Sequence, residues 1–414
     1  SNSRISLSNN DGGGTGGIDS TSGNTILGYL AGTAIASGGT NNTVFGHKAG
    51  TALTVGDANV AIGARALATE DAGQHSTAVG IDALFSQDVG TGVAGNTGLG
   101  NESGYYNETG TSNTYVGYKA GQGASGQSNS SNTAVGTEAL LAIRTGDGNT
   151  AIGTSAADAM TDGHENVAMG VGALGASTSV GYAVAVGYTA MNADATAAAD
   201  GTVAIGYQAL NDLTSGAGNV AVGYQAMDTT TTGQKNVAVG YTALSAGTGN
   251  SYNVAIGYTA MNANATTAAN GTVAIGYSAL NALTSGERNL AIGWQSIKGL
   301  TDGDDNVMIG YNAASAANSS GFSYNVGVGN YVFDGFGSTV DAAYNTAVGH
   351  LALSGVLTSD ADHNTAIGYS SLVNLTSGDG NVAIGSGAGD ALTEGHRNII
   401  IGKTAGYAIT TEDD

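Results

Sequence analysis

The sequence predicts an all-β fold, a parallel β-solenoid or β-roll of about 22 coils. A five-residue word, Asn-(Thr/Val)-Ala-(Ile/Val)-Gly or a close variant, occurs twenty-two times, most often seventeen residues apart. Within the word, as in Asn236-Val237-Ala238-Val239-Gly240, β-branched and small residues alternate with the period of a strand. Seventy glycines, no proline and a single tryptophan leave too little bulk for a globular core. A helix would lose about 1 kcal/mol at each glycine relative to alanine, so strands are favoured.

The repeat extends from the word at 24–28 to the word at 398–402. Successive closing glycines are 17 to 20 residues apart, and the extra residues lie between words, as at 192–201, where we expect a surface loop. Seventeen extended residues trace about 55 Å, enough for one flattened coil, and 22 coils would stack to roughly 100 Å. We expect a lead-in segment at 1–23, one β-solenoid repeat domain at 24–406 and an acidic C-terminal tail at 407–414. Because the chain starts at Ser1 rather than methionine, we expect an excerpt or a mature fragment.

Each repeat unit is expected to hold more than the word. A second apolar pair, such as Ala209-Leu210, predicts a second short strand, and a stretch such as 213–218 predicts a turn. We expect the bulky residues of the word to face the interior of the roll, and the alanine and glycine side to form an interface. The first-position asparagines, including Asn149 and Asn289, are expected to form an amide ladder at a turn.

The repeat resembles those of two families. The words NVAVG at 219–223 and NTAIG at 364–368 resemble the repeats of trimeric autotransporter adhesin heads, and this likeness covers residues 24 to 406. Those heads use somewhat shorter repeats and carry a stalk and membrane anchor that this sequence does not match. The fuller unit, Asn-Thr-Ala-Ile-Gly-Tyr-x-Ala-Leu with a Thr-Ser-Gly turn, is more similar to arrays in marine bacteriophage tail-fibre proteins, whose lead-in segments residues 3–11 also resemble. The resemblances imply a left-handed β-roll in a homotrimeric rod.

Charge and cysteine content bear on partners and location. Ten basic and thirty-two acidic residues give a formal net charge of −22, which repels nucleic-acid phosphates and anionic membranes. We therefore expect no nucleic-acid partner and no membrane insertion. The sequence has no cysteine, which removes disulfides as a source of stability and is compatible with a cytosolic or an exported protein.

An aromatic residue often follows the closing glycine, and stacked coils would align these residues into a ladder. Such a ladder could bind sugar rings, but aromatic packing between adjacent coils is the favoured interpretation. The residues concerned are Tyr29, Tyr118, Tyr188, Tyr207, Tyr224, Tyr241, Tyr258, Tyr277, Trp294, Tyr311 and Tyr369.

Metal and catalytic signatures are weak. Aspartate-bearing turns at 302–305 and 376–380 offer oxygen ligands of the kind that calcium prefers, but they match no known calcium loop, and solvated turns are favoured. The six histidines are scattered without a spacing suited to zinc, and we expect them in surface turns. Glycoside cleavage by a pair of carboxylates remains an open alternative, because acidic residues are plentiful. We assign no catalytic, cofactor-binding or metal residues and expect no cofactor.

The sequence thus favours a non-enzymatic, homotrimeric, extracellular fibre or adhesin segment, at a virion tail or a cell surface. The specific expectation is a phage tail fibre that acts as a stiff spacer and contacts a host cell-surface glycan or protein receptor. Two alternatives stay open: a polysaccharide-degrading tail spike, and a bacterial surface adhesin or filament subunit, including one built from single-chain solenoids. The variable connectors at 101–113, 176–182 and 331–344 are the expected places for ligand contacts.

Overall fold

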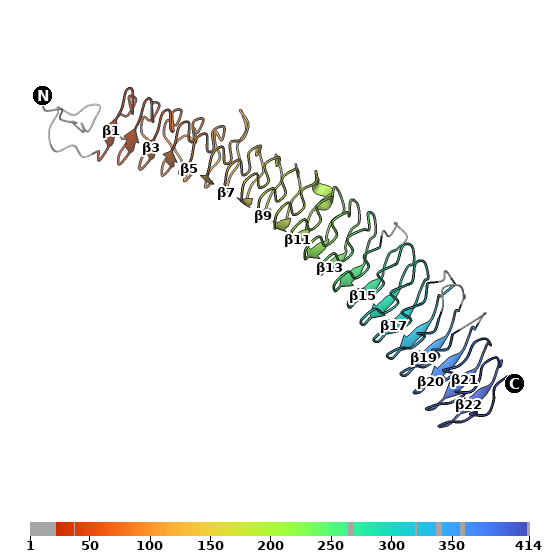
Figure 1. Cartoon of the computed structure of the whole chain (residues 1–414). Coiled ribbons are helices and arrows are strands. Elements are labelled where there is room, and N and C mark those ends of the chain that lie inside the picture. Colours follow the sequence, from red (N-terminus) through yellow and green to blue (C-terminus); the bar gives the residue numbers. More distant parts are fainter. Residues whose placement is uncertain are drawn as a thin grey trace. The chain divides into compact units, whose positions relative to one another are not determined.

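The computed structural model describes residues 22–36, 38–263, 269–318, 321–336, 342–356 and 361–411. The chain divides into two compact units, Ser1–Thr202 and Val203–Asp414. Within each unit, coils follow one another in sequence order and the strands of successive coils lie side by side (Figure 1). Most of the lead-in predicted at 1–23 and the last three residues of the tail predicted at 407–414 lie outside the described residues, so these boundaries stay predictions.

The first unit has ten strands of three residues and one short 3₁₀ helix in its described part. They are β1 (Thr25–Leu27), β2 (Thr43–Phe45), β3 (Val60–Ile62), β4 (Thr77–Val79), β5 (Thr97–Leu99), β6 (Thr114–Val116), β7 (Thr133–Val135), β8 (Thr150–Ile152), β9 (Val167–Met169), β10 (Val184–Val186) and the helix η1 (Ala197–Ala199). The helix η1 lies in the long connector at 192–201, where the sequence predicted a surface loop.

The second unit has twelve strands of three residues in its described part. They are β11 (Val203–Ile205), β12 (Val220–Val222), β13 (Val237–Val239), β14 (Val254–Ile256), β15 (Val273–Ile275), β16 (Leu290–Ile292), β17 (Val307–Ile309), β18 (Val326–Val328), β19 (Thr346–Val348), β20 (Thr365–Ile367), β21 (Val382–Ile384) and β22 (Ile399–Ile401).

Every strand occupies the three middle residues of the repeated word and pairs in parallel with the strand of the next coil in its unit. In the second unit, Val220 of β12 is opposite Val237 of β13, which is opposite Val254 of β14. The same register holds along the first unit, for example between β7 and β8. The prediction of an all-β parallel solenoid is therefore confirmed, with about 21 turns.

The prediction of a second short strand in each repeat is wrong. Ala209 lies in a turn, where its backbone N–H donates to the carbonyl oxygen of Gly206 (3.4 Å). Leu210 has a φ of 51°, in the left-handed region, and a strand cannot continue through such a residue. The N–H of Leu210 instead donates to the carbonyl oxygen of Ala226 in the next coil (3.0 Å). The backbone groups of this segment are thus satisfied between coils without forming a sheet.

The expectation that bulky residues of the word face the interior is also wrong. In β13, Ala238 is fully buried, whereas Val237 is half-buried and Val239 is 36% exposed. The reason is the narrow interior, which the opposite wall already fills with leucine: a Cβ added to Gly98 of β5 would lie only 2.9 Å from Cγ of Leu84. A close-packed interior of this width accepts little more than a methyl group from the strand. The β-branched residues therefore face outward, and they rather than the alanine side are available for an interface.

A large residue occupies the central strand position only where its neighbours make room. Tyr115 of β6 is fully buried, and its hydroxyl bonds to Oδ1 of Asn129. The equivalent residue of β5 is Gly98, and a Cβ added to Gly121 would lie 2.2 Å from the Tyr115 ring. The volume of the interior is thus conserved between coils although the side chains differ.

The asparagine ladder is confirmed. Asn236 is fully buried, and its Oδ1 accepts a hydrogen bond from the backbone N–H of Asn253 in the next coil (2.9 Å). Its Nδ2 donates to the carbonyl oxygen of Asn250 (2.7 Å), and its own backbone N–H donates to Oδ1 of Asn219 (3.0 Å). The same bonds recur along both units. Each amide satisfies two buried backbone groups of the next coil, which stabilises the stacking register.

The closing glycine of each word makes a corner that requires glycine. Gly80 has a φ of 143°, and a Cβ added there would lie 2.4 Å from the carbonyl oxygen of Gly100 in the next coil. Along both units, the closing glycines have φ values between 129° and 150°. Because L side chains rarely adopt this conformation, the corner fixes glycine once in every coil.

We expect Gly80→Ala to destabilise the first unit by about 1–3 kcal/mol or more. The new Cβ would strain the backbone and would clash with the carbonyl group of Gly100. Gly92→Ala is the matched control in the same unit, since a Cβ there would have only one atom near it, the Val89 carbonyl oxygen at 4.0 Å. We expect the control to change stability by less than about 1 kcal/mol. Thermal and urea unfolding followed by circular dichroism measure both variants. Equal losses in the two variants would contradict the role assigned to the closing glycine.

Candidate functional site

The aromatic residues that follow the closing glycines form a stacked run in the second unit. Neighbouring ring centroids lie 4.0 to 5.3 Å apart, with interplanar angles of 6° to 9°. The run consists of Tyr207, Tyr224, Tyr241, Tyr258, Tyr277 and Trp294. The prediction of aromatic packing between adjacent coils is therefore confirmed for this run. Because the ring faces cover one another, the run presents ring edges and hydroxyl groups to solvent and offers no internal face for a sugar.

The aromatic run borders a row of exposed aliphatic side chains. The third residue of each strand points outward two positions before the aromatic residue, as Val239 does before Tyr241. We call these two rows together the apolar band. Its exposed strand members in the second unit are Ile205, Val239, Ile256, Val328, Val348, Ile367, Ile384 and Ile401, and those in the first unit are Phe45, Leu99, Ile152 and Met169.

The band is large for a single chain. Twelve coils at about 4.8 Å each make it roughly 55 Å long in the second unit alone. Monomeric soluble proteins rarely expose contiguous apolar surface of more than a few hundred Å². The band therefore exposes aliphatic and aromatic side chains on coil after coil of the described chain.

The histidines lie in surface positions, as predicted. All six are exposed, and several contact a neighbouring aromatic ring: Tyr29 stacks on His47, and Tyr369 stacks on His350, both at 5.6 Å between centroids. The six are His47, His75, His164, His350, His363 and His396. In the described part of the chain, no three histidines, aspartates or glutamates gather in a way that could hold a metal ion.

The aspartate-bearing turn at 302–305 is held by hydrogen bonds within the chain. Oδ1 of Asp304 accepts from the backbone N–H of Glu287 (2.7 Å), and Asp305 forms an ion pair with Arg288 (2.7 Å). The hydrogen bond from Arg288 lowers the pKa of Asp305. These carboxylates therefore already have partners in the preceding coil.

One carboxyl group of the second unit, that of Asp228, has a strongly raised pKa. Asp212 and Asp228 lie in neighbouring coils, where the N–H of Asp212 donates to the carbonyl oxygen of Asp228 (3.1 Å). Burial, and after it the charge of Asp212, raise the pKa of Asp228 from 3.8 to about 6. The Asp228 carboxyl group thus holds its proton up to a higher pH than an ordinary aspartate does.

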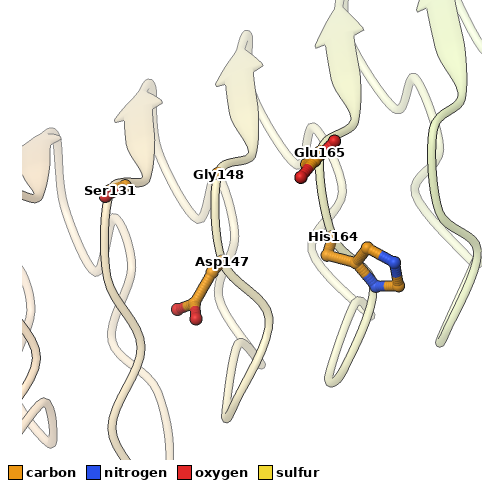
Figure 2. A pocket seen from close by; sticks show the side chains of 5 residues that line it. All are labelled: Ser131, Asp147, Gly148, His164 and Glu165. Atoms are coloured by element: carbon orange, nitrogen blue, oxygen red, sulfur yellow. The ribbon is translucent and has the colours of Figure 1, made fainter.

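A shallow depression of about 440 Å³ lies on the first unit, at the turn before the asparagine ladder. It is lined by Ser131, Asp147, Gly148, His164 and Glu165, which precede strands β7, β8 and β9. Figure 2 shows that the side chains of Asp147 and His164 point in different directions. They do not converge on a common point as an acid–base pair or a metal site would require.

One of the three variable connectors, at 176–182, contacts a residue that lines this depression. The connector at 176–182 ends in Tyr182, which is 55% exposed and contacts the ring of His164. The connector at 331–344 falls partly outside the described residues, at 337–341, and the connector at 101–113 contributes the buried Asn107 and Asn113. Sequence reasoning did not find the lining residues, because their turn positions carry no common motif.

No protein-family model matches the chain, and no curated protein is significantly similar to it. In the described part of the chain, no helix is long and apolar enough to cross a membrane.

We expect Asp228→Asn to raise the melting temperature at pH 7 to 8 and to leave it nearly unchanged below pH 4. The folded state binds the Asp228 proton more tightly than the unfolded state, so the charged carboxylate costs stability as the pH rises from about 4 through about 6. Thermal unfolding between pH 3 and pH 8 measures the difference. Asp302→Asn, at an exposed turn of the same unit, is the control and should show no such pH dependence. A difference that is constant across this range would contradict the assignment.

Proposed function

We propose that this chain is a structural segment of an extracellular fibre or adhesin, in which three copies associate through the apolar band. The apolar band is the observation that carries the proposal. In a single chain, the aliphatic side chains and tyrosines of the band are exposed to water, and burying them against another molecule would lower the free energy.

The regularity of the band favours identical copies as the partner. Each coil presents the same pair of positions in the same register, as Val239 and Ile256 do on adjacent strands. A surface that repeats in this way is matched by another copy of itself, and identical copies usually associate with closed rotational symmetry. The number three comes from the resemblance of the repeat to trimeric adhesin heads and phage tail fibres.

The spacer role is supported by the bonding between coils. Strand pairing, the asparagine ladder and the stacked aromatic run all connect each coil to the next within a unit. A lateral push on one coil would therefore strain several bonds at once, which makes each unit stiff. The net charge of −22 disfavours nucleic acid and anionic membranes as partners.

The proposal is structural rather than catalytic. Asp228, whose pKa is raised, and its neighbour Asp212 do not line the depression, and the side chains of Asp147 and His164, which do line it, point in different directions. Glycoside hydrolysis needs two carboxyl groups placed on either side of a bound sugar.

We expect the full chain in solution to have three times the 40.3 kDa mass of one chain. The double variant Val239→Lys and Ile256→Glu should shift it towards the single-chain mass. These residues are neighbours on adjacent strands, so the two new charges can pair within the chain, but they resist burial between chains. Light scattering after size exclusion measures the mass, and circular dichroism checks folding.

The control places the same charges on the same two coils away from the band, as Gln234→Lys with Ser251→Asp. Oγ of Ser251 accepts from the backbone N–H of Gln234, a bond that an aspartate at this position can replace. We expect this variant to keep the wild-type mass. A single-chain mass for the wild-type protein would refute the trimer and favour a single-chain solenoid.

The absence of catalysis is tested directly. Incubation of the full chain with bacterial surface polysaccharides should release no oligosaccharides, as measured by chromatography of the supernatant. Release of products that Asp228→Asn or Asp212→Asn abolishes would instead establish a polysaccharide-degrading spike.

A further inference from the structure

The outward side of the strands has a different chemistry in the two units. The first residue of each strand points outward, as the half-buried Thr133 of β7 and Val220 of β12 show. This residue is threonine in every strand from β4 to β8, and it is aliphatic in every strand from β11 to β18. Burial of an aliphatic side chain lowers the free energy, whereas a threonine hydroxyl must exchange its bonds with water for new ones. The strands of the second unit are therefore better suited to burial against another chain.

The row of residues that follow the closing glycines differs in the same way. In the second unit, the stacked run from Tyr207 to Trp294 is unbroken, with neighbouring ring centroids 4.0 to 5.3 Å apart. In the first unit, small or polar residues interrupt the row, namely Ala64, Asn101, Thr137 and Thr154. The apolar band is thus continuous along this run of the second unit and interrupted in the first unit.

The next row differs most. We call the residues two positions after the closing glycines the flank row. In the first unit, consecutive coils place charged residues in this row: Lys48, Arg65, Asp82, Glu102, Lys119 and Glu138. The flank row of the second unit lies wholly in the described part of the chain and has no charged residue: it consists of Gln208, Gln225, Thr242, Thr259, Ser278, Gln295, Asn312, Tyr331, Leu351, Ser370, Gly387 and Thr404.

The charges of the first unit lie beside the band and are paired within the chain. Nζ of Lys119 lies over the ring of Tyr118, 5.3 Å from its centroid, and forms an ion pair with Glu102 (3.8 Å). Arg65 forms an ion pair with Asp82 (2.5 Å). Burial against another chain would remove water from these groups, and the cost of that loss can exceed the attraction within the pairs.

The flank row of the second unit is held by bonds between neutral side chains. Nε2 of Gln225 donates to Oε1 of Gln208 (3.0 Å), and the hydroxyl groups of Thr259 and Ser278 are hydrogen-bonded to each other (2.9 Å). These bonds lie within one chain, so they persist when a second chain approaches. The cores of protein interfaces are depleted in charged residues and enriched in aromatic ones, as this part of the band is.

The second unit is also large enough to carry an interface by itself. Its band is about 55 Å long, and a strand of three residues is about 10 Å wide, which gives roughly 550 Å² before the aromatic row is added. Specific interfaces cover about 800 Å² on each partner. With the aromatic row included, the second unit approaches this size without a contribution from the first unit.

We infer that copies of this chain associate through the second unit, and that the corresponding face of the first unit stays in contact with water. Three separate rows support this division: the first strand residues, the aromatic row and the flank row. The inference rests on the proposed function, because it states which part of the apolar band the copies bury.

The test compares two matched double variants of the full chain. Val239→Lys with Ile256→Glu changes the second unit, and Val135→Lys with Ile152→Glu places the same charges on the adjacent strands β7 and β8 of the first unit. Light scattering over a range of concentrations measures the dissociation constant, and circular dichroism checks folding. We expect the second-unit variant to raise this constant about a hundredfold or more, and the first-unit variant to change it less than about threefold.

A further variant leaves every apolar residue in place. Gln208→Lys with Gln225→Glu gives the second unit a charged flank row like that of the first unit. The backbone accepts these residues, because Lys119 and Glu138 occupy the same position with φ values of 56° and 60°. We expect this variant to fold and to associate about tenfold more weakly than the wild type, since its new charges must lose water in the interface.

Trp294 gives an independent measurement of the second unit. It is the only tryptophan of the sequence, it belongs to the aromatic run, and it is 45% exposed in the single chain. Association should bury it and shift its fluorescence emission to shorter wavelengths as the protein concentration rises. We expect the same shift in the first-unit variant and its loss in the second-unit variant.

The outcomes separate this inference from the proposed assembly. A three-chain mass for the wild type, with equal dissociation of the two double variants, would overturn the inference and leave the trimer intact. Unchanged association of the variant with Gln208→Lys and Gln225→Glu would also overturn it. A single-chain mass for the wild type at every concentration would refute the proposed assembly, and the inference with it.

Discussion

The structure depends on the backbone hydrogen bonds that join each coil to the next in an unshifted register. Each strand is only three residues long, which is too short to be stable alone. Each strand is stabilised because equivalent positions of successive words lie next to each other. Asn236, for example, bonds to Asn253, and Gly80 lies close to Gly100. A shift by one residue would place side chains where only glycine fits and would bury unpaired backbone groups. The sequence tolerates extra residues between words, because a connector such as 192–201 lies outside the strands and the asparagine ladder.

Close stacking also decides what faces inward and what faces outward. The interior of each coil is narrow, and leucine from one wall leaves space for little more than alanine from the other, as Ala238 and Leu244 illustrate. The β-branched residues that strands favour are consequently placed on the outside, where they join the aromatic row in the apolar band. Because strands favour β-branched residues and the interior is thin, a single chain is left with apolar side chains exposed on its surface. The proposed association between chains rests on that exposed surface, and the number three rests on the resemblance of the repeat to trimeric adhesin heads and phage tail fibres.

Departures from the repeat have two different outcomes. Inside the coil they are compensated by neighbours, as Gly98 and Gly121 make room for Tyr115, and the surface does not change. At the turn before the asparagine ladder, the His164 ring lies against Gly181, and a depression lined by Ser131, Asp147, Gly148, His164 and Glu165 is present there. A solenoid can thus carry a local depression at a turn without any change in its stacking.

The sequence by itself determined the solenoid, the position of each strand within the word, the asparagine ladder and the stacking of the tyrosines. These features follow from the period and from local chemistry, which repeat in every unit and so reinforce one another. Only the tertiary structure decided which side of the strand is inside, because alternation gives two faces but does not say which one the opposite wall leaves room for. It likewise decided that the Ala209-Leu210 segment is a turn, since left-handed conformations at residues such as Leu210 arise from bonds to the next coil. The depression beside Tyr182 could not be predicted either, because it depends on where the His164 ring lies among residues from three neighbouring coils.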